Sequence, residues 1–209
     1  MIRVLIADDH AIVRKGLKQL LLEEYPSAKI GEAGDAEGLV AEAMNEKWDV
    51  VVCDMSMPGR SGLDALHQIK QVAPGLPVLI MSMYPEDQYA LRVLKAGASG
   101  YLGKETIHDE LIKAIQTVMQ GRKYITASIA EKLAEAFNTD TNQHPHELLS
   151  DREFDVLKLL AAGKSVSDIA EKLSLSVTTV STYRSRIMEK MNMRSNAELT
   201  RYAIEYKLI

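Results

Sequence analysis

Three carboxylates stand at points in the sequence where an apolar run ends. Asp8 and Asp9 follow the apolar residues 4–7, and Asp54 follows the apolar residues 50–53. Carboxylates held close together repel one another, so such a cluster favours a compensating cation. A ligand set made of hard oxygen atoms, without His or Cys, favours Mg²⁺. A carboxylate can also attack a phosphoryl group as a nucleophile, which gives an aspartyl-phosphate.

Two further side chains that could handle a phosphoryl group stand after the next apolar runs. Ser82 ends residues 77–82, and Lys104 follows residues 99–103. A hydroxyl can donate a hydrogen bond to a phosphoryl oxygen, and an ammonium can neutralise part of its charge. Taken singly, each residue is explained as a strand cap or a solvated surface residue. Their shared placement at successive apolar ends favours a phosphoryl site.

Short apolar runs alternate with amphipathic segments in the first part of the chain. The runs predict strands, and the segments predict helices because their apolar residues recur at helical spacing. The predicted strand and helix pairs are residues 4–7 and 12–24, 29–33 and 36–47, 50–53 and 62–72, 77–82 and 87–97, and 99–103 and 109–121. Near-continuous apolar strands with helical connections predict an α/β fold, a doubly wound five-stranded parallel sheet. Ligands bind at the carboxyl ends of such strands, where the carboxylates meet if the first strand lies beside the third.

The acidic set resembles the receiver domain of two-component response regulators, which has a flavodoxin-like fold, over residues 1–122. The resemblance implies that Asp54 is the phosphoacceptor. It also implies a Mg²⁺ site in which Asp9 is a direct ligand and Asp8 a ligand through water. Asp54 and the backbone carbonyl of Ser56 complete that site. The expected cofactor is therefore Mg²⁺.

The same resemblance assigns roles to the later strand ends. Ser82 and Lys104 are expected to contact the phosphoryl group, and Tyr101 matches an aromatic switch residue. Pro58 and Gly62 fit the loop after the phosphoacceptor, with backbone roles only. Phosphorylation is expected to draw Ser82 and Tyr101 inward and to repack the region of the fourth and fifth strands.

The chain changes character after the predicted sheet. Residues 123–147 are predicted to be a linker, with one helix over residues 126–137 and then a polar segment without periodicity. Residues 148–209 carry helical patterns only, which predicts a small all-α domain. Two capping boxes are predicted in it, Ser150 with Glu153 and Ser195 with Glu198.

Residues 165–191 predict a helix, a tight turn over residues 173–176 and a second helix whose exposed side is polar and basic. Hydroxyl and basic side chains suit a DNA major groove, because they contact phosphates and base edges. A solvated basic face on an amphipathic helix is the alternative explanation. The residues predicted to contact DNA are Thr179, Ser181, Thr182, Tyr183, Arg184, Ser185, Arg186, Lys190 and Arg194.

Residues 148–209 resemble the LuxR-type helix-turn-helix domain. The matching landmarks are Leu-Ser-Asp-Arg-Glu at 149–153, Ile-Ala at 169–170, Thr-Val at 179–180 and Ala-Glu-Leu at 197–199. Both parts together resemble the NarL/FixJ class of response regulators. Ser181 and Tyr183 depart from that pattern, which often has Lys and His at these positions, so the identity of the DNA site does not carry over.

Charge and composition agree with two modules. Residues 148–209 contain ten Lys or Arg against eight Asp or Glu, net +2, and the remainder contains fifteen against twenty-one, net −6. The single cysteine, Cys53, excludes an internal disulfide and fits a reducing cytoplasm. No apolar run approaches the ~18 residues that a membrane span needs. A cytoplasmic protein without a membrane partner is expected.

These patterns predict a transcriptional regulator that is not an enzyme. The resemblance implies that a sensor histidine kinase phosphorylates Asp54 and that this releases the second domain to dimerise on double-stranded DNA. A phosphoryl-transfer enzyme is one alternative, although a second aspartate two positions after Asp54 is absent, where haloacid-dehalogenase-type phosphatases place their acid. A regulator controlled mainly by partner binding is another. A LuxR protein that senses a small molecule is disfavoured by the complete acidic set.

Overall fold

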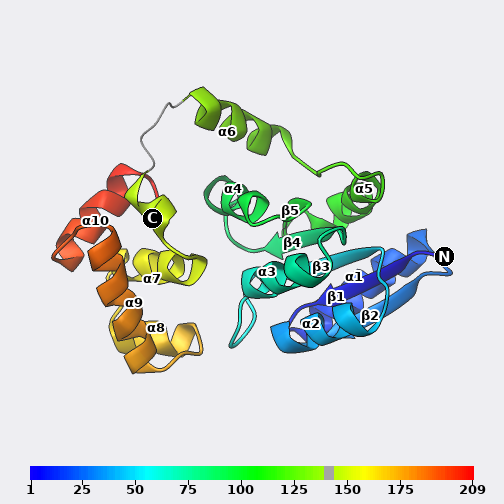
Figure 1. The fold of residues 1–209 in the computed structure, drawn as a ribbon, viewed down its shortest axis with the longest axis horizontal. Coiled ribbons are helices and arrows are strands. Elements are labelled where there is room, and N and C mark those ends of the chain that lie inside the picture. The colour runs from blue at the N-terminus through cyan, green and yellow to red at the C-terminus, as the bar shows by residue number, and fades with distance from the viewer. Residues whose placement is uncertain (139–143) are drawn as a thin grey trace. The chain divides into compact units, whose positions relative to one another are not determined.

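The alternating runs and amphipathic segments form a parallel sheet with helices on both faces (Figure 1). The computed structural model describes residues 1–138 and 144–209, and the chain divides after Asn138 into two compact units. The strand order in the first unit is β2-β1-β3-β4-β5, all parallel, so the predicted fold class is confirmed. The strands are β1 Arg3–Ala7, β2 Lys29–Ala33, β3 Val50–Asp54, β4 Val78–Ser82 and β5 Gly100–Gly103.

Helices α1 and α5 contact each other and cover one face of the sheet, around a cluster that includes Ile6, Val52, Leu21 and Ile115. Helices α2 and α3 contact each other, and α4 packs against β5. The central strands β3 and β4 are buried along their whole length. The helices of this unit are α1 Ala11–Glu24, α2 Ala36–Asn45, α3 Gly62–Val72, α4 Glu86–Lys95, α5 Ile107–Met119 and α6 Ala127–Asn138.

The segment after α5 is held against the edge strand β5. The Tyr124 N–H donates to the Ser99 carbonyl at 2.8 Å, and Lys123 Nζ donates to the Ala98 carbonyl at 2.6 Å. Gly100 permits this approach, because a Cβ there would lie 2.9 Å from the Cβ of Tyr124. Helix α6 then packs against α4. Both features, which the sequence placed in the linker, therefore belong to the first compact unit.

The second unit consists of helices, as its sequence patterns predict. A buried core with Phe154, Leu157, Val180, Ile187 and Leu199 holds it together. Its elements are the 3₁₀ turn η1 Pro145–Leu148 and the helices α7 Asp151–Ala161, α8 Val166–Lys172, α9 Val177–Lys190 and α10 Asn196–Glu205. In the part of the chain that the structure describes, no helix combines the length and apolar character needed to cross a bilayer.

The turn between α8 and α9 forms as the helix-turn-helix pattern requires. Ser174 takes a left-handed φ of 53°, and the Leu175 N–H donates to the Ala170 carbonyl at 2.8 Å. The Ser176 hydroxyl then accepts from the Thr179 N–H and begins α9. Helix α9 is thereby set as the second helix of the motif, with Val180 facing the core.

One of the two predicted capping boxes is complete and the other is half formed. Ser150 and Glu153 exchange both hydrogen bonds at the start of α7. At the start of α10, the Ser195 hydroxyl accepts from the Glu198 N–H and donates to the Glu198 carboxylate, but that carboxylate accepts the backbone N–H of Arg194 in place of the backbone N–H of Ser195. The reciprocal half of that prediction is wrong, because the extended backbone at Ser195 (φ −146°) presents the preceding N–H to the carboxylate.

Candidate functional site

The strand register brings the predicted polar residues to one edge of the sheet. Ala7 pairs with Cys53, so Asp8 and Asp54 are the next residues on adjacent strands. Asp54 pairs with Met81, one residue before Ser82, and Ser82 pairs with Gly103, one residue before Lys104. The four side chains thus stand at the carboxyl ends of β1, β3, β4 and β5. The assumption that the first strand lies beside the third is confirmed.

Lys104 joins two carboxylates at this edge. Its Nζ lies 2.8 Å from Asp8 Oδ2 and 2.9 Å from Asp54 Oδ2. Both aspartates are almost fully buried, and the lysine side chain is 13% exposed. Gly62 closes the loop over Asp54, because a Cβ there would lie only 2.0 Å from the Asp54 carbonyl oxygen. The loop role expected for Gly62 is therefore a steric requirement.

The electrostatics of the site leave negative charge in excess. Burial raises the pKa of Asp54 to about 6, although Lys104 and the Ser56 N–H lower it and Asp8 raises it further. Burial alone would lower the pKa of Lys104, but the hydrogen bond to Asp8 and the charge of Asp54 raise it above its ordinary value. One ammonium therefore serves two buried carboxylates, and the site favours an added cation.

Asp9 and His10 line the open side of the same cluster. Asp9 Oδ1 is buried without a hydrogen bond of good geometry, and His10 Nδ1 lies 2.8 Å from it. The same nitrogen lies 3.2 Å from Asp8 Oδ1. One ligand atom each from Asp8, Asp9, His10 and Asp54 falls within a 4.8 Å group, so these residues could hold a metal ion. Carboxylate oxygens gathered this closely fit a divalent cation.

Ser82 and Tyr101 are already buried. The Ser82 hydroxyl oxygen accepts from the Tyr84 N–H at 3.0 Å, and the Tyr101 hydroxyl donates to the Tyr84 carbonyl at 2.7 Å. Tyr84 also stacks on Tyr89, with 4.8 Å between ring centroids. Both side chains therefore already lie inside the structure, where they were expected to move only on phosphorylation. Ser56 is exposed, and its N–H faces the Asp54 carboxylate.

Two contacts to the acidic strand end were not predicted from the sequence. Arg14 Nη1 donates to the Asp8 carbonyl at 2.6 Å, while its Nε lies 3.6 Å from Glu32. His10 joins the cluster through its side chain and its N–H, which donates to Asp8 at 2.7 Å. The only sequence feature that could have indicated this contact of His10 is its position next to Asp9. Arg14 carried none, because its contact depends on the first turn of α1.

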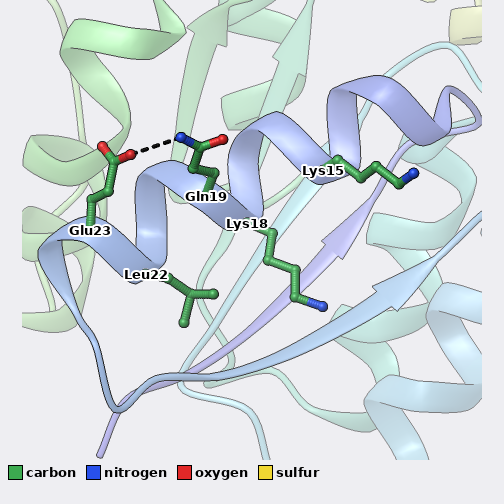
Figure 2. Close-up of a pocket in the computed structure, with 5 residues that line it drawn as sticks. All are labelled: Lys15, Lys18, Gln19, Leu22 and Glu23. Atoms are coloured by element: carbon green, nitrogen blue, oxygen red, sulfur yellow. Dashed lines mark hydrogen bonds between the residues drawn. The ribbon is translucent and has the colours of Figure 1, made fainter.

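The hollow on the exposed side of α1 is separate from the acidic site. Figure 2 shows that its lining residues project from this one helix, and that Gln19 donates to Glu23 at 3.0 Å. No predicted site residue contributes to it. Its lining consists of Lys15, Lys18, Gln19, Leu22 and Glu23.

The predicted DNA contacts lie on or just after α9 with unequal exposure. Thr179 and Tyr183 are half-buried. Arg184 Nε donates to Asn196 Oδ1 at 3.1 Å, and Lys190 Nζ lies 2.6 Å from Glu153 Oε2. The exposed members are Ser181, Thr182, Arg184, Ser185, Arg186, Lys190 and Arg194. An exposed polar face beside an arginine-rich end therefore remains available to a nucleic acid.

Comparison with known proteins identifies both units. Residues 4–116 match the family model described as the response regulator receiver domain, and residues 147–203 match that of the bacterial regulatory proteins of the luxR family. The chain belongs to the LuxR-type response regulators. It is 37% identical to the oxygen regulatory protein NreC of Staphylococcus epidermidis, over 99% of both chains. It is also 37% identical to the response regulator GacA of Pseudomonas viridiflava, over 100% of this chain and 98% of the other.

Solved response regulator structures agree in fold. An RcsB–DNA complex superposes with a TM-score of 0.58 at 28% identity, covering 96% of both chains. RcsB of Salmonella enterica serovar Typhimurium, bound to a promoter in the presence of the phosphomimetic BeF₃⁻, gives 0.63 at 28% identity, covering 97% of this chain and 98% of that one. This response regulator is accordingly a DNA-binding transcription regulator of a two-component system and not an enzyme.

Proposed function

We propose that Asp54 accepts a phosphoryl group from the phosphohistidine of a sensor histidine kinase and that this controls DNA binding by the second domain. The observation that carries the proposal is the Asp54 carboxylate itself, buried at a central strand end with Lys104 Nζ at 2.9 Å. A carboxylate in this position can attack phosphorus, while the ammonium offsets charge on the transferred group.

The transfer forms a bond between an Asp54 carboxylate oxygen and phosphorus and breaks the bond between phosphorus and the kinase imidazole nitrogen. Lys104, which contacts Asp54 and Asp8, turns one N–H toward a phosphoryl oxygen. The Ser82 hydroxyl, held near Tyr84, donates its hydrogen to another. Asp8, Asp9 and Asp54, with the Ser56 carbonyl, would hold Mg²⁺, which when bound neutralises phosphoryl charge.

The new charge acts on the strand ends that lie beside α4. Phosphorylation replaces the single negative charge of the Asp54 carboxylate with the roughly two charges of a phosphoryl group, in a site that holds one ammonium. Ser82 and Lys104 are drawn to the phosphoryl group, and the region of β4, α4 and β5 repacks around Tyr101. In this proposal the receiver masks the recognition helix until then, and release permits a homodimer to bind paired half-sites. RcsB structures with dimers on DNA support the last step.

The test is labelling of the full chain by acetyl phosphate with Mg²⁺, followed by intact mass. Asp54→Asn is expected to abolish the gain of one phosphoryl group. Asp35→Asn is the matched control, because Asp35 caps α2 through its side chain and Asn caps equally well. It should label at the wild-type rate. Labelling of the Asp54 variant at the wild-type rate contradicts the proposal.

One observation favours a second candidate, a regulator controlled mainly by partner binding. Tyr101 and Ser82 occupy buried positions without a phosphoryl group, so that part of the expected change is present beforehand. DNA affinity measured with and without acetyl phosphate separates the two. Equal affinities, with Asp54 labelled, support control by a partner.

A further inference from the structure

Lys190 is the last residue of α9, and its ammonium is directed toward α7. Its Nζ lies 2.6 Å from Glu153 Oε2, although its side chain remains 40% exposed. The sequence places Lys190 among the DNA contacts because it belongs to the basic end of the recognition helix. The observed ion pair suggests a different role for this one residue.

Glu153 explains why the lysine is held there. The residue is 2% exposed, and its Oε2 also accepts the Ser150 N–H at 2.7 Å. A buried carboxylate that loses its cation is strongly destabilising. Burial raises the pKa of Glu153, but the hydrogen bonds from Lys190 and Ser150 outweigh it and hold the pKa below its ordinary value. Glu153 is thus an anion that requires Lys190.

The ion pair joins the carboxyl end of α9 to the amino end of α7. Ile187, one turn before Lys190, and Met191, directly after it, are both buried in the core. These apolar contacts attach the helix, but a short charge-assisted hydrogen bond adds a directional constraint at its end. Capping by Ser176 fixes the other end. The orientation of the recognition helix on its domain therefore depends on Lys190.

We infer that Lys190 is a positioning residue for DNA binding, which acts through Glu153 and does not contact a phosphate. The inference rests on the DNA-binding role of the family and is independent of phosphorylation at Asp54. Arg186 provides the contrast, because it lies on the exposed part of the same helix. The two residues carry the same charge and should differ in how their loss affects DNA binding.

The salt dependence of binding separates the two roles. Each phosphate contact contributes about 0.9 to the slope of log affinity against log salt concentration. Lys190→Met and Arg186→Met are compared in the full chain, by fluorescence anisotropy on a labelled duplex selected with the wild-type protein from a random library. Lys190→Met should weaken binding at every salt concentration without changing the slope, and should lower the Tm of its domain by more than about 10 °C. Arg186→Met should reduce the slope by about 1 with its Tm unchanged.

A double variant keeps the inference testable where Lys190→Met folds poorly. Glu153→Gln combined with Lys190→Met removes both charges, while Gln can still accept from the Ser150 N–H. Because no buried charge is left unpaired, the Tm should return toward that of wild type, whereas affinity should stay below wild type with the wild-type slope, since the bond that positions α9 is still absent. A slope lower by about 1 in either variant overturns the inference, since Lys190 would then contact a phosphate. A double variant that folds and binds DNA with wild-type affinity overturns it as well, since the bond between Lys190 and Glu153 would then not position the helix.

Discussion

The two compact units each contain a lysine that faces a buried carboxylate, and the two sites differ in charge balance. In the receiver, Lys104 lies between Asp8 and Asp54, one ammonium for two carboxylates. In the DNA-binding unit, Lys190 forms an ion pair with Glu153, and the same carboxylate also accepts the Ser150 N–H. The residue types and the burial of the acids are nearly the same.

The pKa shifts of the two acids run in opposite directions. Burial raises the pKa of Asp54 to about 6 because Lys104 compensates only part of it, whereas Lys190 and Ser150 overcome burial and lower the pKa of Glu153. An acid left short of partners is ready for a cation or an incoming phosphoryl group. An acid whose partners compensate for its burial has a structural role. Burial of charge alone does not separate a reactive site from a structural one; the balance of partners does.

Removing Lys104 should produce the largest change, because it leaves two buried carboxylates facing each other. Lys104→Met is expected to destabilise the receiver by about 3–5 kcal/mol at pH 8 without Mg²⁺. Urea unfolding followed by circular dichroism measures the loss, and excess Mg²⁺ should recover part of it. Lys113→Met, at an exposed position of α5, should stay within about 0.5 kcal/mol of wild type. An unchanged midpoint for Lys104→Met would mean that the acidic site is not short of positive charge.

Asp54→Asn should stabilise the folded chain at neutral pH. The pKa of Asp54 is about 6 in the folded state against 3.8 for an unperturbed aspartate, so between these pH values the folded state keeps a proton that the unfolded chain has lost. Stability therefore falls as the pH rises from about 4 to about 6, and the full penalty, about 2–3 kcal/mol, persists above that range. The uncharged variant should be more stable than wild type by that amount at pH 8 with EDTA, and equal to it below pH 4. Equal stability at both pH values would argue against a strained carboxylate.

The sequence was sufficient to predict the acidic site because it depends only on strand order. Apolar runs of four or five residues fixed where each strand ends, and parallel strands bring their carboxyl ends to one edge. Asp8, Asp54 and Lys104 meet there for that reason. Their contact needs no knowledge of side-chain angles.

Contacts that depend on how the helices pack could not be predicted from the sequence. Helical periodicity assigns every polar residue of α9 to the solvent side, so Lys190 could not be distinguished from Arg186. The sequence predicted Glu153 correctly as a capping residue, but it gave no indication that Lys190 is its second partner. The buried position of Tyr101 likewise follows from packing of α4 on β5.

Glu153→Gln should give the smallest change and the opposite sign to Asp54→Asn. The pKa of Glu153 is lowered on folding, so its ionised form stabilises the domain above the unfolded value near 4.5, and this contribution is lost as the pH falls through the folded value. The neutral variant loses a charge-assisted bond to Lys190 and should be less stable by about 1–2 kcal/mol at pH 7. Urea unfolding of the variant and of wild type, at pH 7 and at pH 3, measures their stabilities. Since wild type loses its advantage once Glu153 is protonated, the two curves should converge at the lower pH. A variant as stable as wild type at pH 7 would show that this ion pair, like many exposed ion pairs, contributes no measurable stability. The proposed difference between the two acids would then be supported only by the behaviour of Asp54.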